Sequence, residues 1–425
     1  MNRYVVSTGS LSGHLQVPPS KSQTLRAILF AALAHGTSTI HHPLNANDSN
    51  AMALACKTLG ATIESFPQGL KITGTGGIIR PNSDTIEAGN SGIVLRFCSA
   101  IGALSSSPLT INGDGSRRPM HPLLDGLTQL GAQAISIRGD GYAPVKIRGP
   151  IKSGSARISG EDSQPVSALL IASSFLPGPT SIAVDNAGER PWVAMTLEWF
   201  ERLGIAYTHN NFSHFSLKGH AEYNGFSYRV PGDISNAAFP IAAALATRSE
   251  ISLGNVDMND PQGDKELIAV LQQMGANITH KNNILHVKKG ERLKGVSVDI
   301  NNFVDALPIL AVMGCFAEGE TRISGAGITR HKECNRITCI TQELKKMGAD
   351  IHETADGLVV KASTLRAATL SSHHDHRMAM ALTVAALGAD GQSTIEQVEC
   401  VSKSFPTFMD DFNKLGANIK GIHYG

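Results

Sequence analysis

The sequence predicts an α/β protein of two domains built from six repeats, three in each domain, and three observations lead to this fold class. First, a helix-like stretch runs six times into Leu-Gly or Met-Gly and then into an extended segment. Second, another helix begins once in every repeat. Third, a chain of 425 residues exceeds the size at which single cores stop growing. The six repeat glycines are Gly60, Gly131, Gly204, Gly275, Gly348 and Gly416.

Each repeat glycine stands where a helix is expected to end. Glycine enters the left-handed conformation of a helix C-terminus without a Cβ clash, so Leu-Gly or Met-Gly after an apolar periodic stretch predicts a helix end. An Ala-x-Ile pattern follows in several copies, beginning at Ala61, Ala276 and Ala349. These segments are predicted strands.

The second helix of each repeat is apolar nearly all round, which predicts a buried helix. Its start is polar in each copy, near Ser22, Asn90, Ser163, Ser235, Asp305 and His376. A helix N-terminus has free N–H groups and a positive dipole end, so it attracts anions. Six such ends would form a site for negatively charged ligands if the repeats assemble symmetrically. Ordinary capping without a ligand is the alternative.

Two proline-containing segments mark the predicted domain boundaries. They are Val17-Pro18-Pro19, before the first buried helix, and Val230-Pro231-Gly232, between the third and fourth repeats. Domain I is predicted over 1–17 and 232–425, with the N-terminal strand returning to repeats four to six. Domain II is predicted over 18–231 and holds repeats one to three.

The composition excludes several classes of protein. With 37 Lys and Arg against 36 Asp and Glu, the net charge is +1, which argues against a nucleic-acid partner. The six cysteines form no C-x-x-C pair, so neither a zinc site nor a disulfide framework is indicated. The chain shows no signal-peptide pattern and no apolar run of membrane-spanning length. We expect a cytoplasmic monomer without a membrane partner.

Cations gather near the helix starts of the first half. Lys21 and Ser22 stand at the first helix start, and Arg26 lies one turn further on, an arrangement suited to a phosphate or carboxylate. Gly92 at the second start would let a ligand approach the backbone closely. The loop that follows carries Arg117 and Arg118, a candidate anion clamp or a solvated pair.

The second half adds cations and two carboxylates. Asp305 heads the fifth buried helix, where it is either a cap or a base. Lys332 and Arg336 are expected on one helix face with Glu333 between them. The histidines of His373-His374-Asp375-His376 lack the i, i+4 spacing of a metal site, so the neighbouring Arg377 is interpreted as an anion ligand. Lys403 is a further cation in a turn. Many cations with two carboxylates indicate small polyanionic substrates and acid–base chemistry without a metal.

These motifs, in this order, resemble the 5-enolpyruvylshikimate-3-phosphate synthase family. The similarity runs along the whole chain through Pro19-Ser20-Lys21-Ser22, Gly89-Asn90-Ser91-Gly92, Ser163-Gln164, Asp305, Lys332-Glu333, Asp375-His376-Arg377 and Lys403-Ser404-Phe405-Pro406. It implies a two-domain inside-out α/β barrel whose buried helix N-termini face the interdomain cleft. It also implies transfer of the enolpyruvyl group of phosphoenolpyruvate to shikimate 3-phosphate, in aromatic amino-acid biosynthesis, with no cofactor.

The resemblance also implies residue roles. The catalytic residues would be Lys21, Asp305 and Glu333, with Asp305 accepting the 5-hydroxyl proton and Glu333 protonating the enol methylene. The shikimate 3-phosphate ligands would be Lys21, Ser22, Arg26, Ser163, Gln164, Asp305 and Lys332. The phosphoenolpyruvate ligands would be Lys21, Asn90, Gly92, Arg118, Gln164, Arg336, Arg377 and Lys403.

Several positions depart from the usual family pattern, and two related families are alternatives. The atypical residues are Ile93, Phe97, Asp162, Glu189, Trp192, Ile328 and the pair Cys334-Asn335. The enzyme that transfers enolpyruvyl to UDP-N-acetylglucosamine commonly has a cysteine where 112–119 has none, and an asparagine in place of Ser22. RNA 3'-phosphate cyclases have related repeats, but the neutral net charge disfavours them.

Overall fold

The computed structural model describes residues 2–113 and 118–423, and these form two compact units. Unit 1 consists of the residues up to Pro18 together with those from Pro231 onward, and unit 2 consists of Pro19–Val230. Each unit has its own hydrophobic core. The described helices include none that is long and apolar enough to cross a membrane.

Within the part of the chain that the structure describes, six helices, three in each unit, are buried on nearly every side. In unit 2 they are α1 (Lys21–Leu33), α3 (Gly92–Gly102) and α5 (Ser163–Ser174). In unit 1 they are α7 (Ile234–Ala246), α9 (Leu307–Phe316) and α11 (His376–Leu387). All six begin within a few residues of the predicted polar starts, and the predicted burial is confirmed.

A second helix in each repeat ends one or two residues before a repeat glycine. These helices are α2 (Asn47–Thr58), α4 (His121–Gln129), α6 (Arg190–Leu203), α8 (Glu266–Gln273), α10 (Arg336–Lys346) and α12 (Phe408–Lys414). The glycines that follow all have a positive φ, between 71° and 113°. The left-handed helix ends predicted from the sequence are thus confirmed.

The strands of the described residues form six four-stranded sheets with one shared topology, a parallel pair followed by two antiparallel pairs. The sheets of unit 2 are β14 (Ser227–Arg229), β3 (Thr37–His41), β5 (Gly69–Thr73), β4 (Thr62–Phe66); β6 (Thr85–Glu87), β7 (Leu109–Asn112), β9 (Val145–Arg148), β8 (Gln133–Ser136); and β10 (Ser155–Ser159), β11 (Thr180–Asp185), β13 (His214–Leu217), β12 (Tyr207–Asn210). Those of unit 1 are β2 (Ser12–Gln16), β15 (Glu250–Gly254), β17 (Ile284–Lys288), β16 (Asn277–Lys281); β18 (Ser297–Asp299), β19 (Glu320–Ser324), β21 (Leu358–Lys361), β20 (Asp350–Glu353); and β22 (Thr369–Ser371), β23 (Gln392–Glu396), β1 (Arg3–Ser7), β24 (Asn418–Ile422).

Strands distant in sequence complete the sheets of each unit. In unit 2, β14 pairs in parallel with β3, so the end of the third repeat joins the sheet of the first. In unit 1, β1 lies between β23 and β24 and is antiparallel to both, while β2 pairs in parallel with β15. The N-terminal strands are therefore integral to the unit that the C-terminal half forms.

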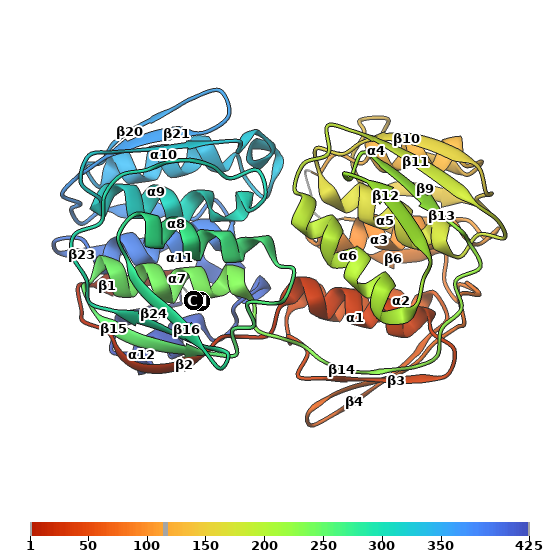
Figure 1. Ribbon diagram of the computed structural model, residues 1–425, viewed down its shortest axis with the longest axis horizontal. Coiled ribbons are helices and arrows are strands. Elements are labelled where there is room, and N and C mark those ends of the chain that lie inside the picture. The colour runs from red at the N-terminus through yellow and green to blue at the C-terminus, as the bar shows by residue number, and fades with distance from the viewer. Residues whose placement is uncertain (1, 114–117, 424–425) are drawn as a thin grey trace. The chain divides into compact units, whose positions relative to one another are not determined.

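Each unit places its most buried helices inside and its sheets outside. Many strands alternate buried and exposed residues, as in Val145–Arg148, whereas the six inner helices are buried on all faces. Figure 1 shows α7, α9 and α11 lying together within unit 1, with strands such as β1, β15 and β23 beside them. Unit 1 also contains the short 3₁₀ helices η1 (Gly263–Lys265), η2 (Val304–Ala306), η3 (Gly327–His331) and η4 (Val398–Lys403). This inside-out α/β arrangement of repeats confirms the predicted fold class.

Candidate active site

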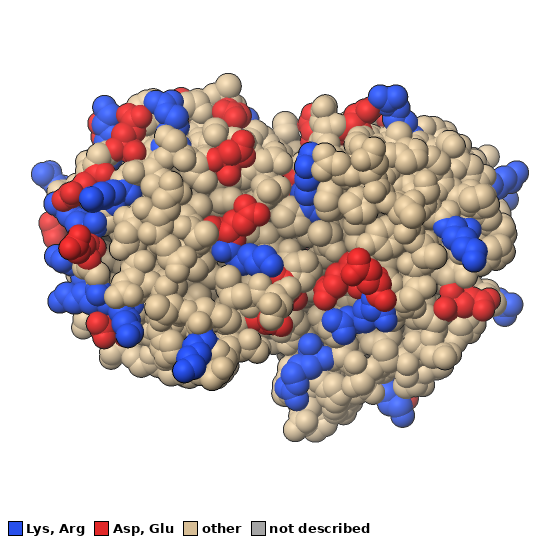
Figure 2. All heavy atoms as spheres, in the orientation of Figure 1, with Lys and Arg blue, Asp and Glu red and all other residues tan. Residues whose placement is uncertain are grey.

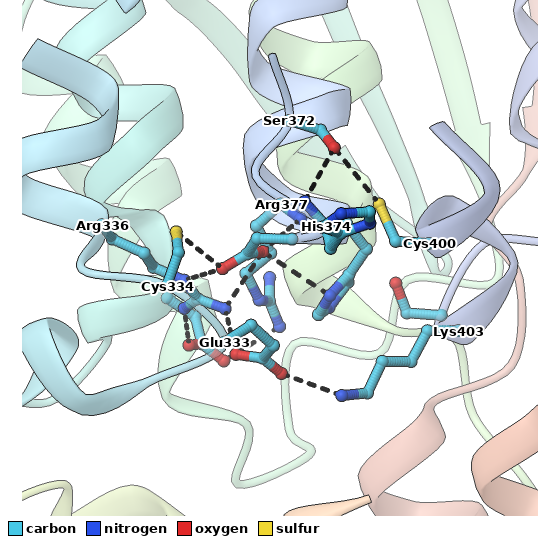
Figure 3. Close-up of polar contacts among 12 residues, drawn as sticks. Glu333, Cys334, Arg336, Ser372, His374, Arg377, Cys400 and Lys403 are labelled. Atoms are coloured by element: carbon cyan, nitrogen blue, oxygen red, sulfur yellow. Dashed lines mark hydrogen bonds and ion pairs between the residues drawn. The ribbon is translucent and has the colours of Figure 1, made fainter. Parts of the chain in front are cut away.

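A buried arginine at the start of α10 gathers three carboxylates in unit 1. The Arg336 side chain is 1% exposed. Its Nη1 donates to Asp305 Oδ1 at 2.7 Å, and its Nε donates to Asp375 Oδ2 at 2.7 Å. Its Nη2 donates to Glu333 Oε2 at 2.9 Å (Figure 3). Burial alone would lower the pKa of Arg336, but these carboxylates raise it well above its usual value.

Two further cations complete the cluster. Arg377, the second residue of α11, lies 2.9 Å from Asp305 Oδ2 and donates to Ser235 Oγ at 3.0 Å. Lys403, at the end of η4, donates to Glu333 Oε1 at 3.0 Å. Asp305 and Glu333, the predicted acid–base residues, thus each lie between two cations that the sequence assigned to anion binding.

The helix starts of unit 1 explain how these side chains are positioned. The Asp375 carboxylate caps α11 by accepting from the Arg377 backbone N–H at 2.8 Å, and Asp233 caps α7. By contrast, α9 has no side-chain cap hydrogen bond, and Asp305 lies before it in η2. The interpretation of Asp305 as a helix cap is therefore wrong, because its two oxygens bind arginines.

Two carboxyls near Arg377 have opposite protonation behaviour. Burial alone would raise the pKa of Asp305, but Arg377, Arg336 and Lys332 lower it far below its usual value. Asp264 in η1 is 2% exposed, and its Oδ2 has no hydrogen-bond partner among the described residues. Burial raises the pKa of Asp264 to about 8, against the opposing charge of Arg377. Burial thus favours the protonated form of Asp264, whereas the neighbouring cations favour the ionised form of Asp305.

The expected helical alignment of Lys332 with Arg336 is wrong. The Asn335 side chain accepts from the Thr338 N–H at 3.3 Å, and this cap makes α10 begin at Arg336. Lys332 therefore precedes the helix and follows η3, where it is 7% exposed. It still contributes charge to the cluster, because it lowers the pKa of Asp305.

In unit 2, the start of α1 carries the first predicted anion-binding group. Lys21 Nζ lies 3.7 Å from Asp48 Oδ2. Arg26 is 2% exposed and donates to the Trp192 carbonyl at 2.9 Å, to Thr196 Oγ1 at 3.0 Å and to the Ser22 carbonyl at 3.3 Å. The last bond confirms that Arg26 lies one turn from Ser22. The acceptors in these three bonds are neutral oxygens.

Arg96 joins the starts of α3 and α5, and sequence reasoning did not select it. It is fully buried, donates to Gln164 Oε1 at 2.8 Å, and lies 3.0 Å from Asp162 Oδ2. A Cβ on Gly92 would lie within 3.1–3.3 Å of Arg96, Arg118 and Gln164. These three side chains therefore lie close around the backbone at Gly92, and the approach of a ligand there stays a prediction. An arginine within an apolar, buried helix is the signal that could have identified Arg96.

The carboxylates of two atypical residues bind at the start of α5, Asp162 from its N-cap and Glu189 from the N-cap of α6. Asp162 caps the helix by accepting from the Gln164 N–H at 3.0 Å, so its carboxylate is shared between this cap and Arg96. Glu189 is 2% exposed and accepts from both the backbone N–H and the hydroxyl of Ser163, at 3.1 and 3.0 Å. A carboxylate thus binds at the helix end predicted for substrate phosphate.

The remaining predicted residues are placed as follows. Asn90 is exposed just before α3, while Arg118 is half-buried. Arg117 lies outside the described residues. His373 Nε2 lies 2.9 Å from Glu343 Oε1, and His374 Nδ1 lies 3.6 Å from Glu399 Oε1. Within 2–113 and 118–423, no group of three or more His, Cys, Asp or Glu side chains is arranged to hold a metal ion.

Charges on the surface are mixed rather than segregated. On the face shown in Figure 2, acidic and basic side chains are interspersed across each unit. The concentrated charge of unit 1 lies instead in the buried cluster around Arg336. This arrangement suits a small anionic ligand better than a long polyanion.

Comparison with known proteins places the chain among carboxyvinyl transferases. The family model for EPSP synthase (3-phosphoshikimate 1-carboxyvinyltransferase) matches residues 5–412. The 3-phosphoshikimate 1-carboxyvinyltransferase of Chlamydia caviae is 46% identical over 100% of this chain and 96% of its own length. That of Acetivibrio thermocellus is 40% identical over 97% and 98%, respectively. The solved structure of EPSP synthase from Acinetobacter baumannii has a TM-score of 0.84 at 29% identity and covers 99% of both chains.

These matches span nearly the whole chain and are of one kind, that of carboxyvinyl transferases. The chain belongs to the EPSP synthase family.

Proposed function

We infer that this chain transfers the carboxyvinyl group of phosphoenolpyruvate to the 5-hydroxyl of shikimate 3-phosphate and releases phosphate, a step of aromatic amino-acid biosynthesis. The full-length family match and the names of the relatives support this function. The observation that carries it is that the carboxylates of Asp305 and Glu333 each pair with two cations, and these cations are suited to binding anions. Both substrates are small polyanions, and the reaction needs acid–base groups beside them.

The reaction proceeds by addition and elimination. The hydroxyl oxygen of shikimate 3-phosphate bonds to C2 of phosphoenolpyruvate, while C3 takes a proton to give a tetrahedral intermediate. The C2–O bond to phosphate then breaks, and C3 returns a proton to restore the double bond. One group must therefore accept the hydroxyl proton, and another must give a proton to C3 and take one back.

Asp305 has the properties of the base that accepts the hydroxyl proton. It is ionised, and its two oxygens are held by Arg336 and Arg377. Such strong pairing makes a carboxylate a weak base. When the anionic groups of phosphoenolpyruvate bind the same guanidinium groups, Asp305 loses part of this stabilisation and its affinity for a proton rises. Substrate binding would thus activate the base.

Glu333 suits the proton transfers at C3 for a related reason. Its carboxylate is 8% exposed and lies between Lys403 and Arg336. An anion bound to these two cations would weaken their hold on Glu333 and favour its protonated form. A protonated Glu333 could donate to C3 in the addition step and accept the proton back in the elimination.

The binding assignments within each unit are part of the same proposal. In unit 2, shikimate 3-phosphate is assigned to Ser22, Arg26, Ser163 and Gln164, phosphoenolpyruvate to Asn90, Gly92, Arg118 and Gln164, and both to Lys21. In unit 1, shikimate 3-phosphate is assigned to Asp305 and Lys332, and phosphoenolpyruvate to Arg336, Arg377 and Lys403. We also propose a monomeric, cytoplasmic enzyme, and sedimentation would measure its oligomeric state.

A phosphate-release assay tests the function directly. The purified protein is mixed with phosphoenolpyruvate and either shikimate 3-phosphate or UDP-N-acetylglucosamine. We expect release of phosphate with shikimate 3-phosphate only, together with a product that carries the enol ether at the 5-position. Release with the UDP-sugar alone would assign the chain to the alternative activity.

A further inference from the structure

The short segment that carries Lys332 and Glu333 has no regular secondary structure of its own. It consists of residues 332–334 and lies between η3 and Asn335, the N-cap of α10. A backbone outside helices and strands keeps conformational freedom that other contacts must remove before its side chains can act on a substrate. The placement of Lys332 and Glu333 therefore depends on what holds the two ends of this 332–334 segment.

A single guanidinium group, that of Arg330, connects the two ends. Arg330 lies in η3, just before the segment. Its Nη1 donates to Asn335 Oδ1 at 3.4 Å and to Thr338 Oγ1 at 3.4 Å. Asn335 Oδ1 also accepts from the Thr338 N–H, and this is the bond that caps α10. One side chain thus joins the residue before the segment to the helix cap after it.

The same guanidinium is bound to the hairpin of β20 and β21. Its Nη2 donates to the Thr354 carbonyl at 2.9 Å, and its Nε donates to the Ala355 carbonyl at 3.3 Å. Its Nη1 also lies 3.1 Å from Glu353 Oε2, which accepts from the Thr338 hydroxyl at 3.1 Å. Figure 1 shows β20 and β21 beside α10. All three guanidinium nitrogens are used, which requires the planar fork of an arginine.

The turn of this hairpin also holds the chain before η3. The Asp356 carboxylate accepts from the Gly325 N–H at 2.9 Å, and the Asp356 carbonyl accepts from the Ala326 N–H at 2.7 Å. Thr329, which is fully buried, donates its hydroxyl to the Ala326 carbonyl at 2.7 Å. The hairpin therefore fixes η3 on one side through Asp356, and on the other side through Arg330.

We propose that Arg330 is a positioning residue: it holds the 332–334 segment against the β20–β21 hairpin, so that Lys332 and Glu333 keep the geometry that turnover requires. The proposal rests on the proposed function, in which Glu333 transfers protons at C3 and Lys332 binds shikimate 3-phosphate. Displacing a catalytic group by about 1 Å can cost about 10²-fold in rate.

The Arg330 contacts should matter most after the substrates bind. In the unliganded protein, Glu333 is also held by Arg336 at 2.9 Å and by Lys403 at 3.0 Å. In the proposed function, the phosphoenolpyruvate anion binds these two cations and weakens their hold on Glu333. The bonds from Arg330 go to the hairpin and to the α10 cap instead, so the incoming anion does not compete for them. They would then keep Glu333 in place during the proton transfers.

Steady-state kinetics of Arg330→Ala measure this contribution. We expect kcat to fall by about tenfold or more, and KM for shikimate 3-phosphate to rise, because Lys332 moves with the segment. KM for phosphoenolpyruvate should stay within about twofold, because Asp305 and Asp375 still hold Arg336, each at 2.7 Å. An unchanged kcat, or a loss seen only as a higher KM for phosphoenolpyruvate, would overturn the proposal.

Chemical rescue shows whether the fork of Arg330 is what matters. Its side chain is 26% exposed, so the space left in Arg330→Ala is open to small ions. Guanidinium chloride at low millimolar concentration should restore part of kcat, whereas sodium chloride at the same concentration should not. Arg330→Lys keeps the charge but not the fork, so its kcat should stay close to that of Arg330→Ala. Full activity of Arg330→Lys would contradict the assigned role.

The matched control is Arg322→Ala in the neighbouring strand β19. Arg322 also pairs with a glutamate, Glu320, at 3.0 Å, and its side chain is 55% exposed. This variant should retain the kinetics of the unsubstituted enzyme. Thermal unfolding of each variant gives the temperature at which all of them are folded, and the kinetics are compared there. A loss in Arg322→Ala equal to that in Arg330→Ala would refute a specific role for Arg330.

Hydrogen exchange tests the positioning without any substrate. In Arg330→Ala, we expect faster exchange in peptides that cover 325–339, where the N–H groups of Ala326 and Thr338 are hydrogen-bonded. Exchange in β23 and β24 of the same unit should not change. Glu353→Gln, a smaller change at the same contact, should accelerate the same peptides to a lesser degree and serves if Arg330→Ala does not fold. Unchanged exchange in 325–339, or equal acceleration in β23 and β24, would overturn the proposal.

The two measurements distinguish this proposal from the proposed function. If the unsubstituted chain does not turn over shikimate 3-phosphate, the proposed function fails, while exchange still decides whether Arg330 holds the segment. If exchange in 325–339 accelerates and kcat stays constant, Arg330 holds the segment for the fold alone, and its role in the reaction is refuted.

Discussion

The Asp305 carboxylate and an incoming substrate anion would compete for the same two guanidinium groups. Asp305→Asn keeps the shape of the side chain but removes both the base and this competition. We expect kcat to fall by at least about 10²-fold, the low end for loss of a general base. KM for phosphoenolpyruvate should stay constant or fall, because Arg336 and Arg377 lose a negative partner. Steady-state kinetics of phosphate release measure both constants.

The matched control is Asp350→Asn, whose side chain in β20 is 62% exposed. This variant should retain the kinetics of the unsubstituted enzyme. A fall of only a few-fold in kcat for Asp305→Asn would mean that another group accepts the hydroxyl proton. A large rise in KM would instead make Asp305 chiefly a ligand.

Because of Asp264, the free energy of unfolding should depend on pH, and a single substitution should remove this dependence. Its pKa is about 8 in the folded protein and near 3.8 when it is free of its surroundings. Between these values the folded state holds a proton that the unfolded chain releases. The contribution to the free energy of unfolding is therefore complete below about pH 4, falls by about 1.4 kcal/mol per pH unit, and is lost above about pH 8.

Asp264→Asn mimics the protonated acid and should remove this contribution. The difference in unfolding free energy between the two proteins, measured with urea at several pH values between about 5 and 8, should change with that slope. The charged groups that act on Asp264 are Arg377, Asp305 and Asp233, so all three must be left unchanged. Asp350→Asn should show no such change. A pH-independent difference for Asp264→Asn would show that Asp264 is ionised.

Sequence reasoning identified the cations of the site but not the partners that hold them. Helix starts and local spacing indicated Arg26 and Arg377, because capping and i, i+4 contacts are local, whereas Arg336 was selected through a helical alignment with Lys332 that is wrong. Arg336 and Asp375 are 39 residues apart, and Arg96 and Gln164 are 68 residues apart. Such contacts depend on how one repeat packs on the next, which no local pattern describes. The buried Asp264 gave no signal for the same reason.

At the scale of the elements, the start of α5 combines two opposing effects of one carboxylate. Glu189 accepts from the Ser163 N–H and hydroxyl, so it stabilises the helix end that is proposed to bind shikimate 3-phosphate. Glu189→Gln should lower the free energy of unfolding by about 1–2 kcal/mol, because a charge-assisted bond becomes a neutral one. It should also lower KM for shikimate 3-phosphate, because a competing negative charge is gone.

Glu198→Gln on the surface of α6 is the control, with a side chain that is 35% exposed. Glu198→Gln should leave both the free energy of unfolding and KM for shikimate 3-phosphate essentially unchanged. A raised KM for shikimate 3-phosphate in Glu189→Gln would argue that the carboxylate positions Ser163 for the substrate rather than competing with it. Denaturant unfolding and phosphate-release kinetics on the same preparations give both values.

Elements whose ends depend on backbone conformation were the most predictable part of the fold. Gly131 and Gly275 have φ values of 98° and 102°, which other residues rarely adopt, so the sequence marks those helix ends directly. The helix expected to include Lys332 begins four residues later, because the Asn335 cap decides its start and a charge pattern does not. The order of strands in each sheet was beyond local patterns, since β3 pairs with β14 from the far end of unit 2.

At the scale of the whole molecule, the two separate cores belong to units of which one is a single segment of the chain and the other is made of two segments. Unit 2 is one continuous segment, whereas unit 1 needs the N-terminal strands β1 and β2 to complete two of its three described sheets. Within β1, Val6 is fully buried in the core of unit 1, opposite Ser393 on one side and Ile419 on the other. Val6→Asp places an unpaired carboxylate there and should cost about 4 kcal/mol or more.

This loss of stability should be confined to unit 1. The unfolding of each unit can be followed with a probe of its own. Both tryptophans, Trp192 and Trp199, lie on α6 in unit 2, so their fluorescence reports the unfolding of that unit alone. Hydrogen exchange in β23 and β24 reports unit 1. In Val6→Asp, we expect faster exchange in these strands and an unchanged fluorescence transition in urea. Val5→Thr, which alters the half-buried face of the same strand, should change neither. If both probes shift together in Val6→Asp, the two cores unfold as one cooperative structure, and their independence is refuted.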